Sequence, residues 1–194
     1  MKLAGLVLAA GAGIRFGQPK ALVPFGGEPL VSRALHMLSE AGCAPVVVVI
    51  GAAAEKVLAA VDLPHVVVNP DWAQGMGSSL ACGLAALPLE VDAVVVALAD
   101  QPLVGKDSVV RLAAAGRHGA VAAVATYGGQ PRNPVLLARS VWLAVTNSLA
   151  GDVGAGPWLR AHPEQVTLVN CDGTGSPYDI DTPDDLLTAT KMED

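Results

Sequence analysis

Charged and aromatic residues are scarce in this chain. Only 15% of its 194 residues are charged and 4% are aromatic, and the net charge is −6. An acidic chain with so few cations offers no broad basic surface, so we expect no nucleic-acid partner. At the same time 52% of the residues are hydrophobic, which excludes a disordered chain. The length suits one hydrophobic core, and we expect a single domain over residues 1–194.

Paired cysteines and long apolar runs are also missing. Cys43, Cys82 and Cys171 are odd in number and have no C-x-x-C spacing, which argues against a disulfide framework or a zinc site. The first apolar run, residues 3–10, is too short to span a bilayer, which takes about 20 residues. It resembles a short signal peptide, but its removal would delete the first strand, and cations follow it. We therefore expect a cytoplasmic protein with reduced thiols and no membrane partner.

The apolar segments that are present alternate between two periodicities. Short valine-rich runs predict buried strands, and runs with apolar residues three or four apart predict helices. The expected strands cover 3–10, 45–50, 65–69, 93–98, 121–127, 134–137 and 165–170, and the expected helices cover 30–41, 53–61, 78–87, 107–115, 139–149 and 183–190. This alternation predicts an α/β fold with a doubly wound, mostly parallel sheet.

A glycine-rich loop follows the first strand. Gly11, Gly13 and Gly17 are interspersed with Arg15, and Lys20 comes shortly after them. Glycines allow backbone N–H groups to approach a ligand closely, and the two cations add positive charge. Such a loop at the end of a strand predicts an anion site, and a polyphosphate is the anion it suits best.

Two common phosphate loops do not match this stretch. A Walker A loop requires Gly-Lys-Ser/Thr, whereas Lys20 stands between Pro19 and Ala21. The dinucleotide fingerprint requires a glycine where Phe16 stands and an acid after the second strand, where 50–52 reads Ile-Gly-Ala. The sequence thus favours neither a P-loop kinase nor an NAD enzyme.

Aspartates stand at two places where a parallel sheet would form a crevice. Asp100 follows the expected strand 93–98, and Asp179 and Asp181 alternate in an extended segment near the chain end. A carboxylate at the tip of a buried strand can hold Mg²⁺, which prefers one or two carboxylates together with phosphate oxygens and water. From spacing alone, Asp100 could equally cap a turn.

Residues 8–20 read Leu-Ala-Ala-Gly-Ala-Gly-Ile-Arg-Phe-Gly-Gln-Pro-Lys. They resemble the opening of the nucleotidyltransferases, more specifically the molybdenum cofactor cytidylyltransferase-like group. The resemblance extends from residue 3 to 187, with Asp-Gln-Pro at 100–102 and Asp-Ile-Asp-Thr-Pro at 179–183 as further matches. It implies a three-layer αβα, Rossmann-like and GT-A-like fold. It also implies a Mg²⁺-dependent enzyme that transfers CMP from CTP to molybdopterin and releases pyrophosphate.

The same resemblance implies roles for individual residues. Lys20, Arg15 and Asp100 would be catalytic, and Asp100 and Asp181 would bind the metal, with Asp179 as the substitute for Asp181. The segment 75–79 resembles the base and ribose pocket of this group, and the Gly-Pro-Leu-Ala-Gly type segment of the GTP-using relatives is absent, which favours CTP. Ser78 and Ser79 could instead be plain helix-capping residues. The nucleotide-binding set would be Ala9, Ala10, Gly11, Ala12, Gly13, Arg15, Lys20, Gly75, Met76, Ser78 and Ser79.

The acceptor side departs from the family pattern. We expect Arg132, Asn133 and Asp152 to bind the acceptor, but Asn133 stands in place of the usual His and Gly156 in place of the usual Arg. Arg132 and Arg160 could compensate or could be surface residues. These departures leave three alternatives open: a sugar or polyol phosphate as acceptor, GTP as donor, or a non-catalytic nucleotide- or cofactor-binding chaperone. A molybdoenzyme or its chaperone could be a protein partner.

Overall fold

The computed structural model describes residues 1–149 and 151–193. Its centre is a seven-stranded sheet in the order β5-β4-β1-β6-β8-β7-β9. Strand β8 runs antiparallel to both of its neighbours, and every other pair is parallel. The strands are β1 (Leu3–Ala9), β4 (Val46–Ile50), β5 (Val66–Val68), β6 (Ala93–Leu98), β7 (Ala122–Tyr127), β8 (Gln130–Ala138) and β9 (Val166–Asn170).

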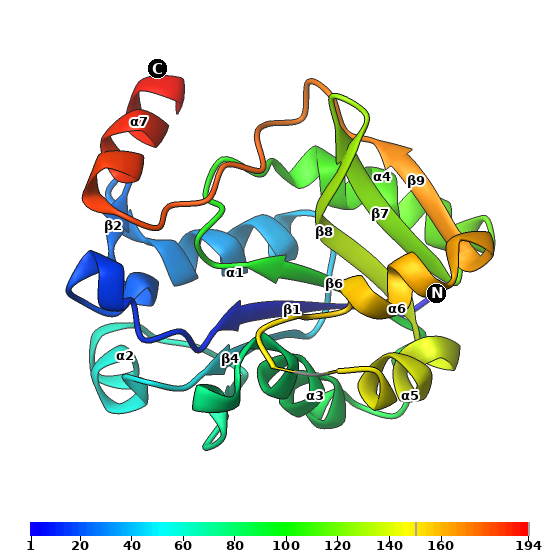
Figure 1. Ribbon diagram of the computed structural model, residues 1–194, viewed down its shortest axis with the longest axis horizontal. Helices are drawn as coiled ribbons and strands as arrows, with labels where there is room; N and C mark the ends of the chain where they lie inside the picture. Colours follow the sequence, from blue (N-terminus) through cyan, green and yellow to red (C-terminus); the bar gives the residue numbers. More distant parts are fainter. Residues whose placement is uncertain (150, 194) are drawn as a thin grey trace.

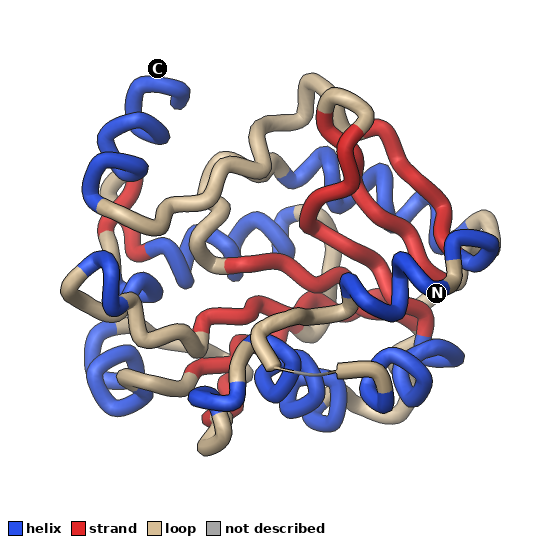
Figure 2. Tube along the Cα trace, viewed as in Figure 1, coloured by secondary structure: helices blue, strands red, loops and turns tan. Residues whose placement is uncertain are grey.

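Helices cover both faces of this sheet, which confirms the three-layer αβα architecture expected from the sequence (Figures 1 and 2). One face packs against α1 (Leu30–Glu40), α2 (Ala54–Ala60) and α4 (Lys106–Arg117). The other packs against α3 (Met76–Ala86), α5 (Arg139–Asn147) and α6 (Gly156–Ala161). A small hairpin of β2 (Pro24–Phe25) and β3 (Glu28–Pro29) and the last helix, α7 (Pro183–Glu193), lie beyond one end of the sheet.

Strand β1 shows why the central strands read as continuous apolar runs. Alternate side chains of a strand point to opposite faces, so Leu6 joins the core under α3 while Val7 joins the core under α1. Both side chains are fully buried. A strand with helices on both sides therefore needs apolar residues at every position.

Strand β8 and helix α6 differ from the sequence-based expectation, and the short β2–β3 hairpin was not expected either. Strand β8 begins at Gln130 rather than 134, because Gly128 and Gly129 take left-handed backbone angles (φ +55° and +73°) and form a hairpin turn with β7. The hairpin makes β8 antiparallel, which apolar periodicity cannot reveal. The short helix α6 was not expected, since Gly156 and Pro157 open it and it ends at Ala161.

The carboxyl ends of β1 and β6 lie side by side, since Leu8 pairs with Leu98. The segment 171–182 returns along this edge from β9 to α7 (Figure 1). It is fixed there by backbone hydrogen bonds from Ser176 N to Leu103 O (2.9 Å) and from Ile180 N to Asp100 O (2.8 Å). Far-apart parts of the chain thus meet at one edge. Within 1–149 and 151–193, no helix has the length and apolar character needed to cross a membrane.

Gly83 allows α3 to lie close to the sheet. A Cβ atom at this position would be 2.5 Å from Cδ1 of Leu6 and 2.9 Å from Cγ2 of Val49. Because both neighbours are fully buried, they have little room to move.

We predict that Gly83→Val lowers the free energy of unfolding by at least about 1–3 kcal/mol, the usual cost of overpacking a core. Ala85→Val, on the exposed side of the same helix, is the matched control, because it carries only the helix-propensity cost of a β-branched residue. Urea denaturation measures both. Equal unfolding midpoints for the two variants would contradict this packing.

Candidate active site

The ammonium group of Lys20 lies between two carboxylates at the carboxyl edge of the sheet. Its Nζ donates to Oδ2 of Asp100 at 2.5 Å and to Oδ1 of Asp181 at 2.8 Å. Lys20 follows the glycine loop, Asp100 follows β6, and Asp181 lies in the returning segment before α7. Three regions that are distant in sequence therefore supply one charged cluster, with the Lys20 side chain only 20% exposed.

Arg15 and Asp179 extend this cluster. Nη2 of Arg15 forms an ion pair with Oδ2 of Asp181 at 3.0 Å, so Asp181 contacts both cations. The carboxylate of Asp179 accepts a hydrogen bond from Nε2 of Gln101 at 2.9 Å. Asp181 therefore faces the cations, while Asp179 is held by a neutral amide.

The glycine loop is shaped by one close backbone approach. Gly13 has φ +64°, and a Cβ atom there would lie 2.1 Å from the carbonyl oxygen of Gln18. No other residue type fits this position. The resulting turn, followed by short 3₁₀ segments at Ile14–Phe16 and Lys20–Leu22, directs both Arg15 and Lys20 toward Asp181.

A helix cap fixes the backbone beside Asp181. The Thr182 hydroxyl accepts from the Asp185 N–H at 3.2 Å, and the Asp185 carboxylate accepts from the Thr182 N–H at 2.8 Å. Asp185 also accepts from the N–H of Asp181 and the hydroxyl of Tyr178. This reciprocal capping box starts α7 and occupies Asp185, which leaves Asp181 to the cluster.

The cluster shifts the pKa values of its members in different directions. Burial alone would lower the pKa of Lys20, but the carboxylates of Asp100 and Asp181 outweigh it and raise that pKa. The hydrogen bond from Lys20 and the charge of Arg15 lower the pKa of Asp181. Burial, together with the charges of Asp100 and Asp181, raises the pKa of Asp179. At neutral pH the ammonium is therefore firmly charged.

The cluster lines a cavity of about 380 Å³. Most of the residues expected to bind the nucleotide are in its wall: Ala9, Ala10, Gly11, Arg15, Lys20, Gly75, Met76 and Ser79. Ala12, Gly13 and Ser78 do not line it. Gly13 shapes the loop instead, and the hydroxyl of Ser78 lies 2.8 Å from the carbonyl of Gly75 and 2.9 Å from that of Asp71. Ser78 is therefore not a helix cap, since α3 begins at Met76 and no side chain caps it; its hydroxyl donates to backbone carbonyls of the preceding turn.

The segment leading into α3 and the first turn of that helix form another part of the cavity wall. The buried amide of Asn69 donates to the hydroxyls of Ser78 and Ser79 at 2.9 and 3.0 Å. Gly75 has φ +103°, and a Cβ atom there would be 2.5 Å from the carbonyl oxygen of Gly151. Asp152 accepts from the N–H of Met76 at 3.2 Å and lines this smaller cavity. We expected Asp152 to bind the acceptor, and that role stays a prediction, because the contact with Met76 alone does not assign Asp152 to either substrate.

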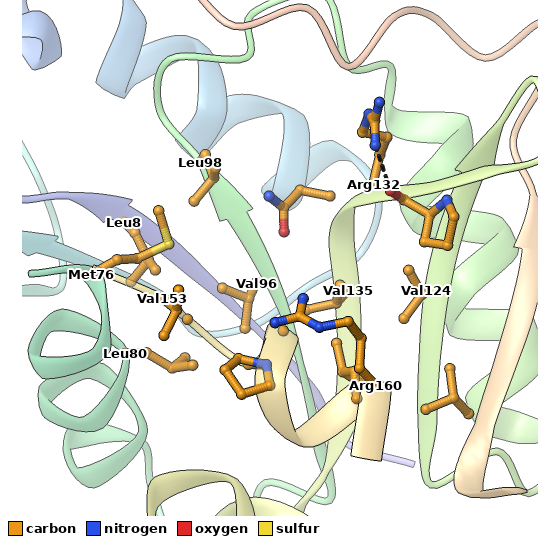
Figure 3. Close-up of a pocket in the computed structure, with 18 of the residues that line it drawn as sticks. Leu8, Met76, Leu80, Val96, Leu98, Val124, Arg132, Val135, Val153 and Arg160 are labelled. Carbon is orange, nitrogen blue, oxygen red and sulfur yellow. Dashed lines mark hydrogen bonds between the residues drawn. The ribbon is translucent and has the colours of Figure 1, made fainter. Parts of the chain in front are cut away.

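A second cavity of about 800 Å³ adjoins the first (Figure 3). The two share Leu8, Met76, Leu98 and Asp179 in their walls. Apolar side chains from β6, β7, β8 and β9 form its floor, and residues of α3 and α6 complete its wall. Arg132 and Asn133, both expected on the acceptor side, line it, as does Arg160.

Gln101 and Asn69 are contributions that the sequence did not place, and Arg160 is one whose role it left open. Gln101 lies within the Asp-Gln-Pro motif, so its position beside Asp100 was a usable signal. Asn69 immediately precedes the Gly-Met segment, but nothing in its spacing indicates that its amide would hold two serines. The role of Arg160 depends on α6, which periodicity did not predict.

The charge balance of the smaller cavity fits a divalent cation. Two cations and four carboxylates line it: Arg15 and Lys20 against Asp100, Asp152, Asp179 and Asp181. Asp100 and Asp181 converge on a single ammonium, which shows that both can face one cation. Within the described part of the chain, no group of three or more His, Cys, Asp or Glu side chains is arranged to hold a metal alone. Two carboxylates completed by phosphate oxygens and water would suit Mg²⁺.

We predict that Asp181→Asn lowers the melting temperature at pH 7 and reduces its decline in acid. Because the folded-state pKa of Asp181 is below its ordinary value of 3.8, its stabilising contribution is present above that value. The contribution is lost as the pH falls through the folded-state pKa. Calorimetry from pH 7 to pH 2 measures this, with Asp62→Asn, an exposed aspartate on another edge, as control. If the melting temperatures of Asp181→Asn and the unmodified protein declined in parallel from pH 7 to pH 2, the ion pairing of Asp181 with Lys20 and Arg15 would be contradicted.

The sequence of this chain is similar to those of known proteins. A family model described as "MobA-like NTP transferase domain" matches residues 5–166. Nicotine blue oxidoreductase from Paenarthrobacter nicotinovorans is 38% identical over 187 residues, covering 92% of this chain and 91% of the relative. Bifunctional protein GlmU from Mycobacterium sp. (strain KMS) is 33% identical over 182 residues, which cover 89% of this chain but 32% of GlmU. This chain thus spans about a third of GlmU.

Solved structures also resemble this chain. Rv0371c from Mycobacterium tuberculosis H37Rv superposes with a TM-score of 0.87 at 29% identity, over 98% of each chain. Its complex with manganese superposes at 0.81, with 30% identity over 98% of this chain and 99% of the other. Molybdopterin-guanine dinucleotide biosynthesis protein A from Archaeoglobus fulgidus, at 20% identity, 97% coverage of both chains and a TM-score of 0.68, shows the shared fold. This chain belongs to the MobA-like NTP transferase family.

Proposed function

We propose that this protein is a Mg²⁺-dependent cytidylyltransferase that transfers CMP from CTP to molybdopterin and releases pyrophosphate. The observation that carries the proposal is the Lys20 ammonium between Asp100 and Asp181, beside a glycine loop and in the smaller of two adjoining cavities. The smaller cavity would hold the triphosphate, and the larger one the acceptor. The proposal treats residues 1–194 as one cytoplasmic domain, in keeping with the free, buried thiols of Cys43 and Cys171.

In the proposed reaction an oxygen of the acceptor phosphate attacks the α-phosphorus of CTP. The new phosphorus–oxygen bond forms as the bond to the β-phosphate bridging oxygen breaks, and pyrophosphate leaves with that electron pair. A phosphate monoester is already anionic at neutral pH, so the attack requires no strong general base. The main barrier is electrostatic, because two anions must approach and charge builds up on the leaving group.

The chain supplies groups suited to that barrier. Lys20 and Arg15 would neutralise the phosphates, and the N–H groups of the glycine loop would face them. Asp100 and Asp181 would hold Mg²⁺, which when bound would offset phosphate charge and polarise the α-phosphorus. With Asp100 and Asp181 as the residues that would hold the metal, the Lys20 ammonium would be available to contact the triphosphate.

The segment 75–79 supports CTP as the donor. Gly75, Met76 and Ser79 line the smaller cavity together with Lys20, and a base and ribose would lie against them. Molybdopterin is the acceptor we favour, because the adjoining cavity of about 800 Å³ is large enough for a fused-ring molecule and has a mainly apolar floor. A molybdoenzyme or its chaperone would then be the protein that receives the product.

A second candidate is an oxidoreductase. It is favoured by one observation, the 38% identity with nicotine blue oxidoreductase over nearly the whole length of both chains. In that case the smaller cavity would hold the phosphates of a redox nucleotide, and the larger one a conjugated substrate. Pyrophosphate release is expected from the transferase alone, so it separates the two candidates.

We predict that Lys20→Ala lowers CTP-dependent turnover by about 10²–10³-fold, the typical cost of removing one donor that stabilises transition-state charge. The measurement is pyrophosphate release with Mg²⁺ and molybdopterin, repeated with GTP and ATP to test the choice of base. Lys56→Ala is the control, because Lys56 is an exposed lysine on α2 that lines none of the cavities described above.

Two outcomes would count against the proposal. Unchanged turnover in Lys20→Ala would remove Lys20 from the reaction. Absence of pyrophosphate release from all three nucleotides, together with oxidation of NADH or NADPH by a conjugated substrate, would favour the oxidoreductase.

A further inference from the structure

The cations around the two joined cavities fall into two groups. In the smaller cavity Lys20 and Arg15 are paired with aspartates. In the larger cavity Arg132 donates to the carbonyl of its own neighbour, Pro131, at 3.0 Å, and it forms no ion pair among residues 1–149 and 151–193. Arg160 forms no ion pair within the same part of the chain. The larger cavity therefore holds two guanidinium groups without an ion-pair partner in this part of the chain, and Asp179 is the one carboxylate in its lining.

Arg160 occupies space that Gly156 leaves open. The two residues are four apart at the start and near the end of α6, so they share a face of the helix. A Cβ atom at position 156 would lie 3.0 Å from Nη1 of Arg160 and 3.8 Å from its Cζ. The guanidinium therefore lies directly over the glycine, and a larger side chain at 156 would displace it.

The guanidinium of Arg160 points into the cavity. Figure 3 shows it extending from α6 toward Val153, on the side where Leu8 and Met76 lie, whereas the guanidinium of Arg132 points away from the cavity centre. Leu8 and Met76 belong to the walls of both cavities. Arg160 is thus directed at the junction, where acceptor and triphosphate would meet.

From this geometry we infer that Arg160 binds the phosphate monoester of the acceptor, and that Gly156 determines this specificity by leaving room for the guanidinium. The inference rests on the proposed function and adds to it the residue that recognises the attacking group. A guanidinium is planar and weakly hydrated, and it binds phosphate through two parallel hydrogen bonds. Apolar walls reduce competition from water, while the sheet floor accommodates a flat ring system attached to the phosphate.

The test compares a fused-ring phosphate with its neutral counterpart, so it needs no turnover. Calorimetry measures the Kd of 2-naphthyl phosphate and of 2-naphthol. We expect the unmodified protein to bind the phosphate more tightly than the alcohol. Arg160→Ala should raise the Kd of 2-naphthyl phosphate about ten- to hundredfold, as expected for loss of a hydrogen-bonded charge pair. It should change the Kd of 2-naphthol less than about twofold. Arg160→Lys should give an intermediate loss of phosphate affinity, because lysine keeps the charge but cannot form the two parallel hydrogen bonds.

Gly156→Val tests the space-making role. It should lower the affinity for 2-naphthyl phosphate by displacing the guanidinium. Adding Arg160→Ala to it should lower that affinity little further, since both substitutions remove the same interaction. Arg117→Ala, at an exposed arginine of α4 that lines neither cavity, is the control and should leave both Kd values unchanged. An unchanged ratio of the two Kd values in Arg160→Ala, or equal affinity of the unmodified protein for both compounds, would overturn the inference.

This result is separable from the proposed function. A loss of phosphate preference in Arg160→Ala, together with no pyrophosphate release from CTP, GTP or ATP in the unmodified protein, would keep the anion site and remove the transfer reaction. The reverse pattern would keep the transfer reaction and remove Arg160 from acceptor binding.

Discussion

The site depends on one interaction, the shared contact of the Lys20 ammonium with Asp100 and Asp181. A lysine side chain that is only 20% exposed loses much of its hydration, which disfavours the charged form. Two carboxylates within 2.8 Å more than compensate for this loss and keep the ammonium protonated. In return, Lys20 and Arg15 hold Asp181 in its charged form. The cluster therefore keeps cations and carboxylates charged and paired at one point. A polyphosphate could pair with the cations there, and a divalent cation could pair with the carboxylates.

The fold brings these groups together because three segments end at the same edge. The parallel pairing of β1 with β6 places the glycine loop and Asp100 side by side. The returning segment 171–182 is hydrogen-bonded to the loop after β6, and Ile180 is buried in a small core with Val23, Phe25 and Leu30. Burial of Ile180 between Asp179 and Asp181 fixes the direction of both acids. The packing of this apolar residue between the two acids thus determines which carboxylate meets the cations.

Much of this could be predicted from the sequence. The main strands and helices up to β7 follow from apolar periodicity, although the β2–β3 hairpin does not. Lys20, Asp100 and Asp181 follow from the motifs that resemble the nucleotidyltransferases. The sequence could not place Asp152, because its side chain meets Met76 through a loop contact that no periodicity encodes. Nor could it distinguish Ser78 from Ser79, since only the fold decides which hydroxyl bonds to the backbone and which lines the cavity. Arg160 was ambiguous for a similar reason, because its direction depends on the absence of a side chain at Gly156.

The most direct test of the central claim is a crystal structure with Mg²⁺ and a non-hydrolysable CTP analogue. The account predicts a metal ion between the carboxylates of Asp100 and Asp181, with the Lys20 ammonium moved onto a phosphate oxygen and the triphosphate along the N–H groups of the glycine loop. A triphosphate bound away from this loop, or a Lys20 ammonium that remains between the two aspartates with no metal beside it, would contradict the account.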